Sequence, residues 1–463
     1  ADAVVVVALA SGPPDRGSAE RALLWPLEDR TGAPDGALPR QLLVVVHEAR
    51  DAAWPKPRRT AAFLKPRPAL DEPGHLHCRC ASAARFLAAD CRRLARFVAG
   101  RAVGVVLGGG GAKGLGHLGA LRAFESLGIE IDVVGGCSQG AMIGAMLSRE
   151  DGWPGGGFPG GSEPLAETRR RAGAFADALC DTMTVVKDYN AASTSLSYFG
   201  GGAFAGGVVR AVGDFAVEDA WIPFFCVSTD VRTCDVRVHA SGDLAPRAVL
   251  ASMSLVGWFP PVYDDGSLLV DGGYAANMPA RELRDLFVGD RATVIGVDVE
   301  SQDTSAFADV QPYGWREGLA GARVVARKLR NYVLPVRLRP RLWRVPQLSD
   351  ISAQLLYIRN SQQLREARDS GDVDFYLRLD SVQRFDLTHY HDIEEIASNA
   401  EAEARRDAAH WLMEMTPPKA KRALRRRSKA GGALADSFLA LAVESDTEEA
   451  APRGAPPPPA PSD

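Results

Sequence analysis

The chain has 463 residues, of which 46% are apolar and 24% charged, and its formal net charge at pH 7 is −4. This composition is ordinary for a globular protein and fits one large catalytic domain with smaller flanking parts, or two domains. The charge excludes a global basic field, so we expect no nucleic-acid partner. The 7 cysteines are odd in number and scattered, which excludes a dense disulfide scaffold and favours an intracellular protein with reduced thiols.

Residues 1–100 are expected to form an N-terminal flanking segment, a partial α/β lobe followed by a linker helix. The apolar runs Val4–Leu9 and Leu42–Val46 predict strands, and Ala81–Gly100 has apolar residues at helical spacing. The start lacks an initiator Met and a basic region, so we expect no secretory signal and interpret the chain as cut from something longer. No apolar run reaches the roughly 20 residues that a membrane-spanning helix needs.

Residues 101–300 show the clearest pattern and predict the core of a catalytic domain. Two predicted strands, Ala102–Leu107 and Ile129–Val134, are each followed by a glycine-rich turn and a predicted helix, at Leu115–Leu127 and Ala141–Ser148. This alternation predicts a parallel-rich α/β sheet with right-handed crossovers. Further strands are predicted at Phe224–Thr229, Val236–His239, Leu268–Val270 and Thr293–Val299, and a surface loop at Gly152–Gly161.

Residues 301–416 predict a C-terminal helical extension of the catalytic region, with helices at Ser349–Ala367 and Ile393–Met415. Residues 417–463 are charged and proline-rich and cannot bury enough apolar surface to offset their ordering entropy. We expect a disordered tail there. Its basic run Lys419–Lys429 is either simply solvated or in contact with anionic membrane.

The segment Gly136-Cys137-Ser138-Gln139-Gly140 has the G-x-S-x-G form of a nucleophile elbow. A serine in a sharp turn between a strand and a helix exposes its hydroxyl, and the flanking Gly136 and Gly140 relieve the crowding of that turn. The five-residue pattern alone recurs by chance, but here an apolar strand leads in and a small-residue helix leads out. We therefore predict that Ser138 is a nucleophile.

A run of glycines from Gly108 to Gly111 lies between a predicted strand and a predicted helix. Such a run leaves several backbone N–H groups free to bind negative charge. In an ester hydrolase that charge is the oxyanion of the tetrahedral intermediate, so Gly109, Gly110 and Gly111 are the candidate oxyanion hole, with Lys113 as an anion-assisting cation. The alternative is a glycine turn that serves close packing.

The same run also fits the dinucleotide-binding fingerprint Gly109-x-Gly111-x-x-Gly114, and Asp132 lies roughly where a ribose-binding acid would be. Under this alternative the region is a binding module. Against it, the second strand ends in a serine elbow, which a nucleotide-binding fold does not need. A P-loop is excluded because Gly114 follows Lys113 where that motif needs Ser or Thr.

Asp271 ends a short apolar strand and is followed by two glycines, so it can reach toward a serine on a neighbouring strand. A serine nucleophile needs a base, and most hydrolases use histidine. Three histidines follow Asp271 and would complete a histidine-dependent α/β-hydrolase: His389, His391 and His410. None of them has a local motif that supports this role.

The glycine run with its basic residue, the G-x-S-x-G elbow and the D-G-G strand end resemble, in that order, the patatin-like phospholipases. The resemblance implies a Ser–Asp dyad in which Ser138 attacks the acyl carbonyl and Asp271 takes and returns the proton, without histidine. We therefore predict a three-layer α/β fold with a parallel-rich central sheet. The predicted activity is that of a serine lipid-ester hydrolase that needs no metal or organic cofactor.

The resemblance narrows to the neuropathy target esterase family over roughly residues 70–400. It implies a lysophospholipase acting on lysophosphatidylcholine and related phospholipids at the membrane of the endoplasmic reticulum. It also implies cyclic-nucleotide-binding-like domains and a membrane anchor upstream of this chain. The segments that carry it are Glu218–Pro223, Ser228–Asp230, Ala251–Met253, Asn277–Pro279, His75–Cys80 and Arg93–Gly100.

Two positions depart from the family's pattern, since Cys137 stands where Thr is usual and Lys113 where Arg is usual. Lysine lacks the planar fork of arginine, so anion contacts at Lys113 are expected to be looser. A cysteine beside the nucleophile raises the question of thiol sensitivity. The cluster His75-x-His77-Cys78-x-Cys80 lacks a second ligand pair at recognisable spacing, so no metal site is predicted.

Overall fold

The computed structural model describes residues 3–9, 40–48, 75–80, 88–149, 165–180, 197, 199–289, 291–300, 348–385 and 389–415. A small parallel sheet in the order β1-β2-β3 consists of β1 (Ala3–Leu9), β2 (Arg40–Glu48) and β3 (His75–Cys80). The apolar runs correctly predicted the first two strands. The polar residues of β3 hid it from the hydrophobicity pattern, although His75 and His77 are buried.

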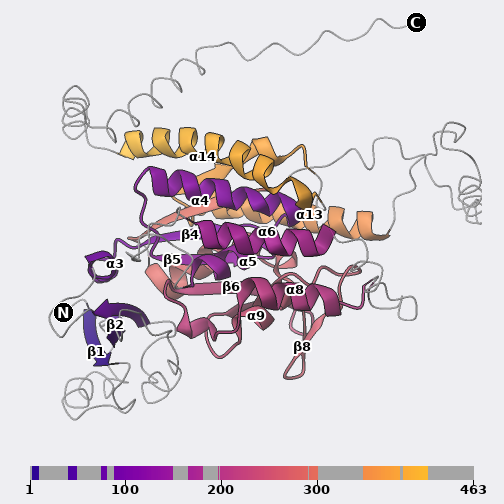
Figure 1. Ribbon diagram of the computed structural model, residues 1–463. Helices are drawn as coiled ribbons and strands as arrows, with labels where there is room; N and C mark the ends of the chain where they lie inside the picture. Colours follow the sequence, from indigo (N-terminus) through magenta and orange to yellow (C-terminus); the bar gives the residue numbers. More distant parts are fainter. Residues whose placement is uncertain are drawn as a thin grey trace, which may run out of the picture.

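The large sheet has 8 strands in the order β11-β10-β4-β5-β6-β9-β8, with β7 paired to β6. Figure 1 labels four of them, β4, β5, β6 and β8. The pairs from β11 to β6 are parallel, whereas β7, β8 and β9 pair antiparallel. The predicted parallel-rich α/β sheet is therefore confirmed. Its strands are β4 (Val103–Leu107), β5 (Val133–Cys137), β6 (Phe224–Asp230), β7 (Asp235–His239), β8 (Val262–Asp264), β9 (Ser267–Asp271), β10 (Thr293–Asp298) and β11 (Phe375–Arg378).

The helices include the two that were predicted beyond residue 301, and none that the structure describes is long and apolar enough to cross a bilayer. The α-helices are α3 (Ala88–Val98), α4 (Gly116–Ser126), α5 (Gln139–Leu147), α6 (Ala166–Cys180), α8 (Gly202–Val212), α9 (Ala245–Ser252), α10 (Ala280–Leu283), α13 (Leu348–Asp369) and α14 (Ile393–Met415). Shorter helical turns are η1 (Gly111–Leu115), η3 (Val217–Asp219), η4 (Gly272–Tyr274), η5 (Arg284–Val288), η7 (Asp380–Val382) and η8 (Tyr390–Asp392).

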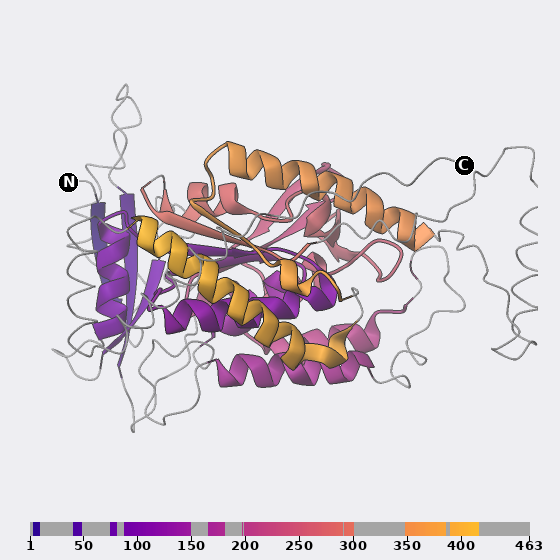
Figure 2. The ribbon, with the colours of Figure 1, turned by 90° about the horizontal axis from the view of Figure 1, so that it is seen from above.

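Side chains of the central strands contribute to two separate hydrophobic cores, because neighbouring residues of a strand face opposite sides of the sheet. Val105 and Phe224 belong to one core, which also holds residues of α4, α5, α6, α8, α9 and α14. Val106 and Phe225 belong to the other, together with residues of α10 and η5, and Leu364 of α13 packs against it. Figure 2 shows α13 on one side of the sheet and α4 and α14 on the other. The three-layer arrangement follows.

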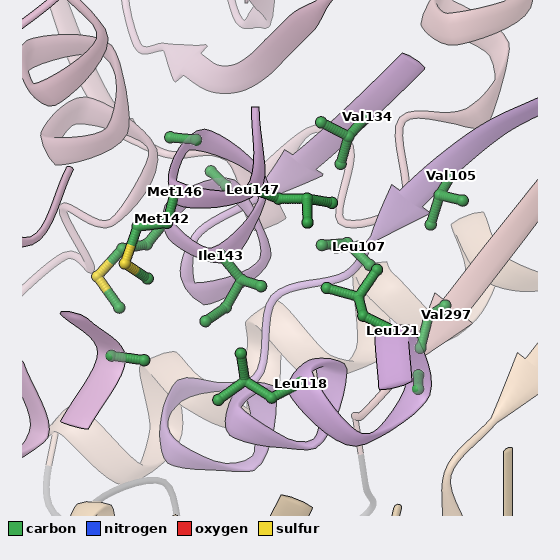
Figure 3. Close-up of a cluster of buried hydrophobic side chains, with 14 of the residues drawn as sticks. Val105, Leu107, Leu118, Leu121, Val134, Met142, Ile143, Met146, Leu147 and Val297 are labelled. Atoms are coloured by element: carbon green, nitrogen blue, oxygen red, sulfur yellow. The ribbon is translucent and has the colours of Figure 1, made fainter. Parts of the chain in front are cut away.

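Helix α5 lies in the middle of the first core and is buried along its whole length. A helix that is apolar all round has to be enclosed by other elements. Figure 3 shows Ile143 of α5 directed toward Leu118 of α4, with Leu107 of β4 close by. The residue that precedes α5 is Ser138, so the predicted nucleophile is attached to one of the most enclosed helices of the domain.

The structure corrects one boundary near this helix. The sequence pattern predicts a strand at Ile129–Val134 and a turn from Gly136, but β5 begins at Val133 and continues to Cys137. The two glycines inside β5 are required by packing, since a Cβ on Gly135 would collide with the ring of Phe225. The predicted loop at Gly152–Gly161 and the tail at residues 417–463 lie outside the described residues.

Candidate active site

Ser138 lies between β5 and α5 with φ 52° and ψ −120°, a backbone conformation that is rare for a residue with a side chain. Such strain persists only where the surroundings enforce it, and it concentrates at functional sites. Here the chain turns against neighbouring backbone: a Cβ on Gly140 would collide with the carbonyl oxygen of Leu107, and one on Gly136 would lie 2.6 Å from the carbonyl carbon of Gly140. Both predicted elbow glycines are therefore needed for the turn.

Strand register brings Asp271 to the same place. Strand β5 pairs with β6 up to the pair Cys137–Val227, and β9 pairs with β6 from the next residue on, at Ser228–Asp271. Because β7 covers the opposite edge of β6 along Cys226–Asp230, β5 and β9 must follow each other on a single edge. The last residue of β9 therefore meets the residue that follows β5, although 133 positions separate them in the chain (271 − 138).

The carboxylate of Asp271 is buried and surrounded by donors. Its Oδ1 accepts a hydrogen bond from the amide of Gly273 at 2.8 Å, and the thiol of Cys137 lies 3.8 Å away. Burial raises the pKa of Asp271 to about 6, while hydrogen bonds from Gly273, the Ser138 side chain and Cys137 lower it. A base is most effective when its pKa lies near the working pH. A pKa of about 6 suits Asp271 to accept a proton at neutral pH, and the neighbouring Ser138 side chain favours its ionised form.

The main chain of both residues is fixed by neighbouring hydroxyl and carbonyl groups. The amide of Ser138 donates to Oγ of the buried Ser252 at 2.8 Å, at the end of α9. The amide of Asp271 donates to the carbonyl of Ser254 at 2.9 Å, and Thr229 Oγ1 donates to the carbonyl of Asp271 at 2.9 Å. The segment Ala251–Met253 carried part of the family resemblance, but no local signal assigned Ser252 a role.

The glycine run faces Ser138, and its three predicted donors are not equivalent. The amide of Gly109 donates to Oδ1 of Asn277 at 3.0 Å. A Cβ on Gly109 would lie 2.6 Å from that oxygen and 3.1 Å from Cβ of Ser138, so only glycine fits between them. Within the described part of the chain, the amides of Gly110 and Gly111 donate to no other group. These two amides remain available to an anion.

Lys113 lies in η1 and is buried. Its positive charge acts on Glu300: burial raises the pKa of Glu300 to about 8, and Lys113 opposes that increase. The predicted cation therefore lies in the neighbourhood of the glycine run, where its charge interacts with a carboxyl group of the protein.

The thiol of Cys137 is fully buried, and burial raises its pKa well above the usual value. Since the thiolate is the reactive form, a buried neutral thiol is protected from thiol reagents. The cysteine beside the nucleophile therefore gives no ground for thiol sensitivity.

No histidine contacts Ser138 or Asp271 among the residues that the structure describes. His391 pairs with its neighbour Asp392 at 3.3 Å, and His410 lies 3.9 Å from Glu414 on α14. His117 donates to the carbonyl of Gly108 at 2.8 Å. Burial lowers the pKa of His117 to about 4, so it is neutral at pH 7.

Two further polar sites that the sequence suggested have structural partners. Asp132 is fully buried and forms an ion pair with Arg96 of α3 at 2.6 Å, which leaves it unsuited to bind a ribose. The rings of His75 and His77 both donate through Nε2 to the carbonyl of Glu218, at 2.8 and 2.9 Å, so they connect β3 to η3. Across the described ranges, no group of three or more His, Cys, Asp or Glu residues is arranged to hold a metal.

The domain is thus an α/β domain in which a serine with a strained backbone lies between a parallel strand and a buried helix, beside a buried carboxylate. Residues 105–158 and 172–284 match the family described as patatin-like phospholipase. The chain belongs to this family, as its motifs predicted.

Three curated proteins illustrate the relationship. Patatin-like phospholipase domain-containing protein 6 of Homo sapiens is 32% identical over 86% of this chain and 27% of its own length. Neuropathy target esterase sws of Drosophila melanogaster is 32% identical over 73% of this chain and 23% of its own length. Lysophospholipase NTE1 of Mycosarcoma maydis is 36% identical over 63% of this chain and 14% of its own length. The chain thus spans about a quarter or less of the length of these relatives.

Proposed function

We propose that this chain is a serine lipid-ester hydrolase that cleaves the fatty acyl ester of lysophospholipids through an acyl-Ser138 intermediate. The observation that supports this most is the hydrogen bond between the Ser138 side chain and Asp271, whose pKa burial raises to about 6. It occurs inside the region that matches patatin-like phospholipases. A buried carboxylate with such a pKa is a competent base at neutral pH.

In the first half of the reaction, Asp271 takes the proton of Ser138 as the serine oxygen attacks the acyl carbonyl carbon. The negative charge that develops on the carbonyl oxygen is stabilised by backbone amides. We assign this role to Gly110 and Gly111, because Asn277 occupies the amide of the third candidate, Gly109. When the tetrahedral intermediate collapses, the glycerol oxygen leaves and takes the proton from Asp271.

In the second half, water replaces the departed alcohol. The water oxygen attacks the acyl carbon while Asp271 takes a proton from this water. The same amides stabilise the second tetrahedral intermediate. Its collapse breaks the bond to Ser138, which recovers the proton held by Asp271. The fatty acid is released and the dyad returns to its starting state.

The substrate class follows from the relatives. One of them is named a lysophospholipase, and the others are named an esterase and a phospholipase-domain protein. We propose lysophosphatidylcholine and related phospholipids as substrates, met at a membrane surface and, by analogy with this family, at the endoplasmic reticulum. The greater length of the relatives supports regulatory domains outside this chain.

Labelling with a fluorophosphonate, followed by product analysis on lysophospholipids, phospholipids and triacylglycerols, tests the proposal. Wild-type protein is expected to become labelled and to release fatty acid from lysophosphatidylcholine, and Ser138→Ala is expected to do neither. Asp271→Asn should also prevent labelling, whereas His389→Ala and His391→Ala should not. An Asp271→Asn protein that is labelled at the wild-type rate would exclude the dyad.

A further inference from the structure

Helix α13 lies beyond the matched residues 105–158 and 172–284, yet its polar side chains reach the catalytic region. Asn360 of α13 is 1% exposed, and its Nδ2 donates to Oε1 of Glu300 at 2.9 Å. The other oxygen of that carboxyl group, Oε2, accepts from Nδ2 of Asn277 at 3.0 Å. Glu300 therefore connects a C-terminal helix to the segment that follows the D-G-G motif.

This connection determines which way the Asn277 amide points. Because Nδ2 of Asn277 donates to Oε2 of Glu300, the other end of the amide, its oxygen, points away from Glu300. That oxygen, Oδ1, accepts the amide of Gly109 at 3.0 Å. Gly109 in turn lies so close to Ser138 that a Cβ on it would be 3.1 Å from Cβ of the serine. The orientation of one amide thus holds the glycine run against the nucleophile.

A second contact from the same face of α13 holds the main chain of Asn277. Gln363 lies three residues after Asn360, a spacing that places both side chains on one side of a helix. Its Oε1 accepts the amide of Asn277 at 3.3 Å. Both the side chain and the backbone of Asn277 are therefore linked, one through Glu300 and one directly, to α13.

We propose that Asn360 and Gln363 of α13, through Glu300 and Asn277, are positioning residues for the oxyanion hole. This inference rests on the proposed function, since it assumes that the amides of Gly110 and Gly111 stabilise the negative charge of the transition state. None of the four side chains has to touch the substrate. They keep the glycine run in register with Ser138, so that Gly110 and Gly111 present their amides to the attacked carbonyl. The catalytic apparatus then extends beyond the part of the chain that defines the family.

Positioning has a specific kinetic consequence. A misplacement of about 1 Å in a catalytic group costs on the order of 100-fold in rate, and loss of transition-state contacts lowers kcat more than it raises KM. In the full 463-residue chain, we expect Asn360→Ala to lower kcat for lysophosphatidylcholine about 10- to 100-fold with KM changed less than about twofold. Gln362→Ala, on the exposed neighbour in α13, is the matched control and should leave both constants unchanged.

Glu300→Gln is the second variant, chosen because it keeps the shape of the side chain. A glutamine offers one acceptor oxygen and one NH2 group, so it cannot accept from Asn277 and Asn360 together. We expect a loss of kcat similar to that of Asn360→Ala. Because both changes act on one hydrogen-bonded path, the double variant should lose less than the product of the two single effects.

The possible outcomes separate this inference from the proposed function. If wild type hydrolyses lysophosphatidylcholine, Ser138→Ala does not, and yet Asn360→Ala and Glu300→Gln keep the wild-type kcat, the positioning role is wrong and the proposed function stands. A rise in KM at constant kcat, or strictly multiplicative losses in the double variant, would also overturn it. If Ser138→Ala retains activity, the proposed function itself fails. Should Asn360→Ala not fold, Glu300→Gln alone decides by its kcat.

Discussion

Ser228 in strand β6 and Ser138 after strand β5 differ in their backbone position and in their neighbouring side chains. Ser228 Oγ lies 2.8 Å from Nε2 of His239, and Nδ1 of the same ring lies 2.6 Å from Oδ2 of Asp243. These contacts have the order of a Ser–His–Asp triad. Ser138 has a carboxylate, Asp271, and no histidine in contact among the described residues. By side-chain chemistry alone, Ser228 would be the better candidate for a nucleophile.

The backbone reverses this ranking. Ser228 lies inside β6, fully buried, with β7 and β9 paired to it on its two edges. Ser138 lies where a strand ends, with positive φ, next to a glycine run that has unpaired amides. A nucleophile needs an approach for the substrate and donors for the oxyanion, which a paired strand does not offer. Position in the backbone, more than the set of neighbouring side chains, therefore favours Ser138 over Ser228 as the nucleophile.

Replacing each of the two serines tests directly which one is the nucleophile. Ser138→Ala should abolish fluorophosphonate labelling and lower turnover of lysophosphatidylcholine by at least about 10⁴-fold, because the nucleophile is removed. Ser228→Ala should stay within about threefold of wild type, since it removes only a buried hydrogen bond. Labelling intensity and fatty-acid release measure both. Loss of labelling in Ser228→Ala, with Ser138→Ala still labelled, would reverse the assignment.

Asp271→Asn should lower turnover by about 10³-fold or more and at the same time stabilise the fold. The folded-state pKa of Asp271 is raised from 3.8 to about 6, so the charged form is disfavoured in the native protein. The resulting destabilisation is absent below about pH 4 and fully present above about pH 6, where it amounts to about 3 kcal/mol. Asparagine can still accept from Gly273 without carrying charge. Denaturant unfolding at pH 8 should show the gain, and a loss of stability there would contradict it.

The pH dependence of kcat/KM is a smaller effect that tests whether Asp271 is the base. Since only the ionised carboxylate accepts the serine proton, kcat/KM should fall about tenfold per pH unit below about pH 6 and level off above it. A plateau that continues unchanged to pH 5 would show that no group with the pKa of Asp271 controls the reaction. The same measurement on Ser228→Ala is the control, and its profile should coincide with that of wild type.

The hydrogen-bonded cluster of Ser228, His239 and Asp243 should contribute to stability and not to catalysis. His239→Gln should lower the free energy of unfolding by about 1–3 kcal/mol, because Ser228 and Asp243 lose a buried partner. Activity per folded molecule should remain near that of wild type. Thermal unfolding and labelling of the folded fraction measure the two quantities. A drop of labelling larger than the drop in folded protein would place His239 in the catalytic mechanism instead.

Elements with local sequence signals could be predicted before the fold was known. The elbow around Ser138, the strand that ends at Asp271 and helix α14 all follow from patterns within about ten to twenty residues, because periodicity, glycines and short motifs act over that range. These local signals, taken in order, were also sufficient to identify the family. They singled out Ser138 and Asp271, the residues of the proposed dyad, without showing how the chain brings the two together.

Contacts between residues far apart in the sequence could not be predicted in this way. Gly109 and Asn277 are 168 positions apart, and Ser138 and Ser252 are 114 apart, so no local pattern links them. The strand register of β6 brings Asp271 to Ser138, and the packing of α13 brings Asn360 to Glu300. A hydrogen bond joins atoms about 3 Å apart in space, however far apart the two residues are in the sequence. The free amides of Gly110 and Gly111, and the contacts of α13 with Asn277 and Glu300, therefore exist only in the folded molecule.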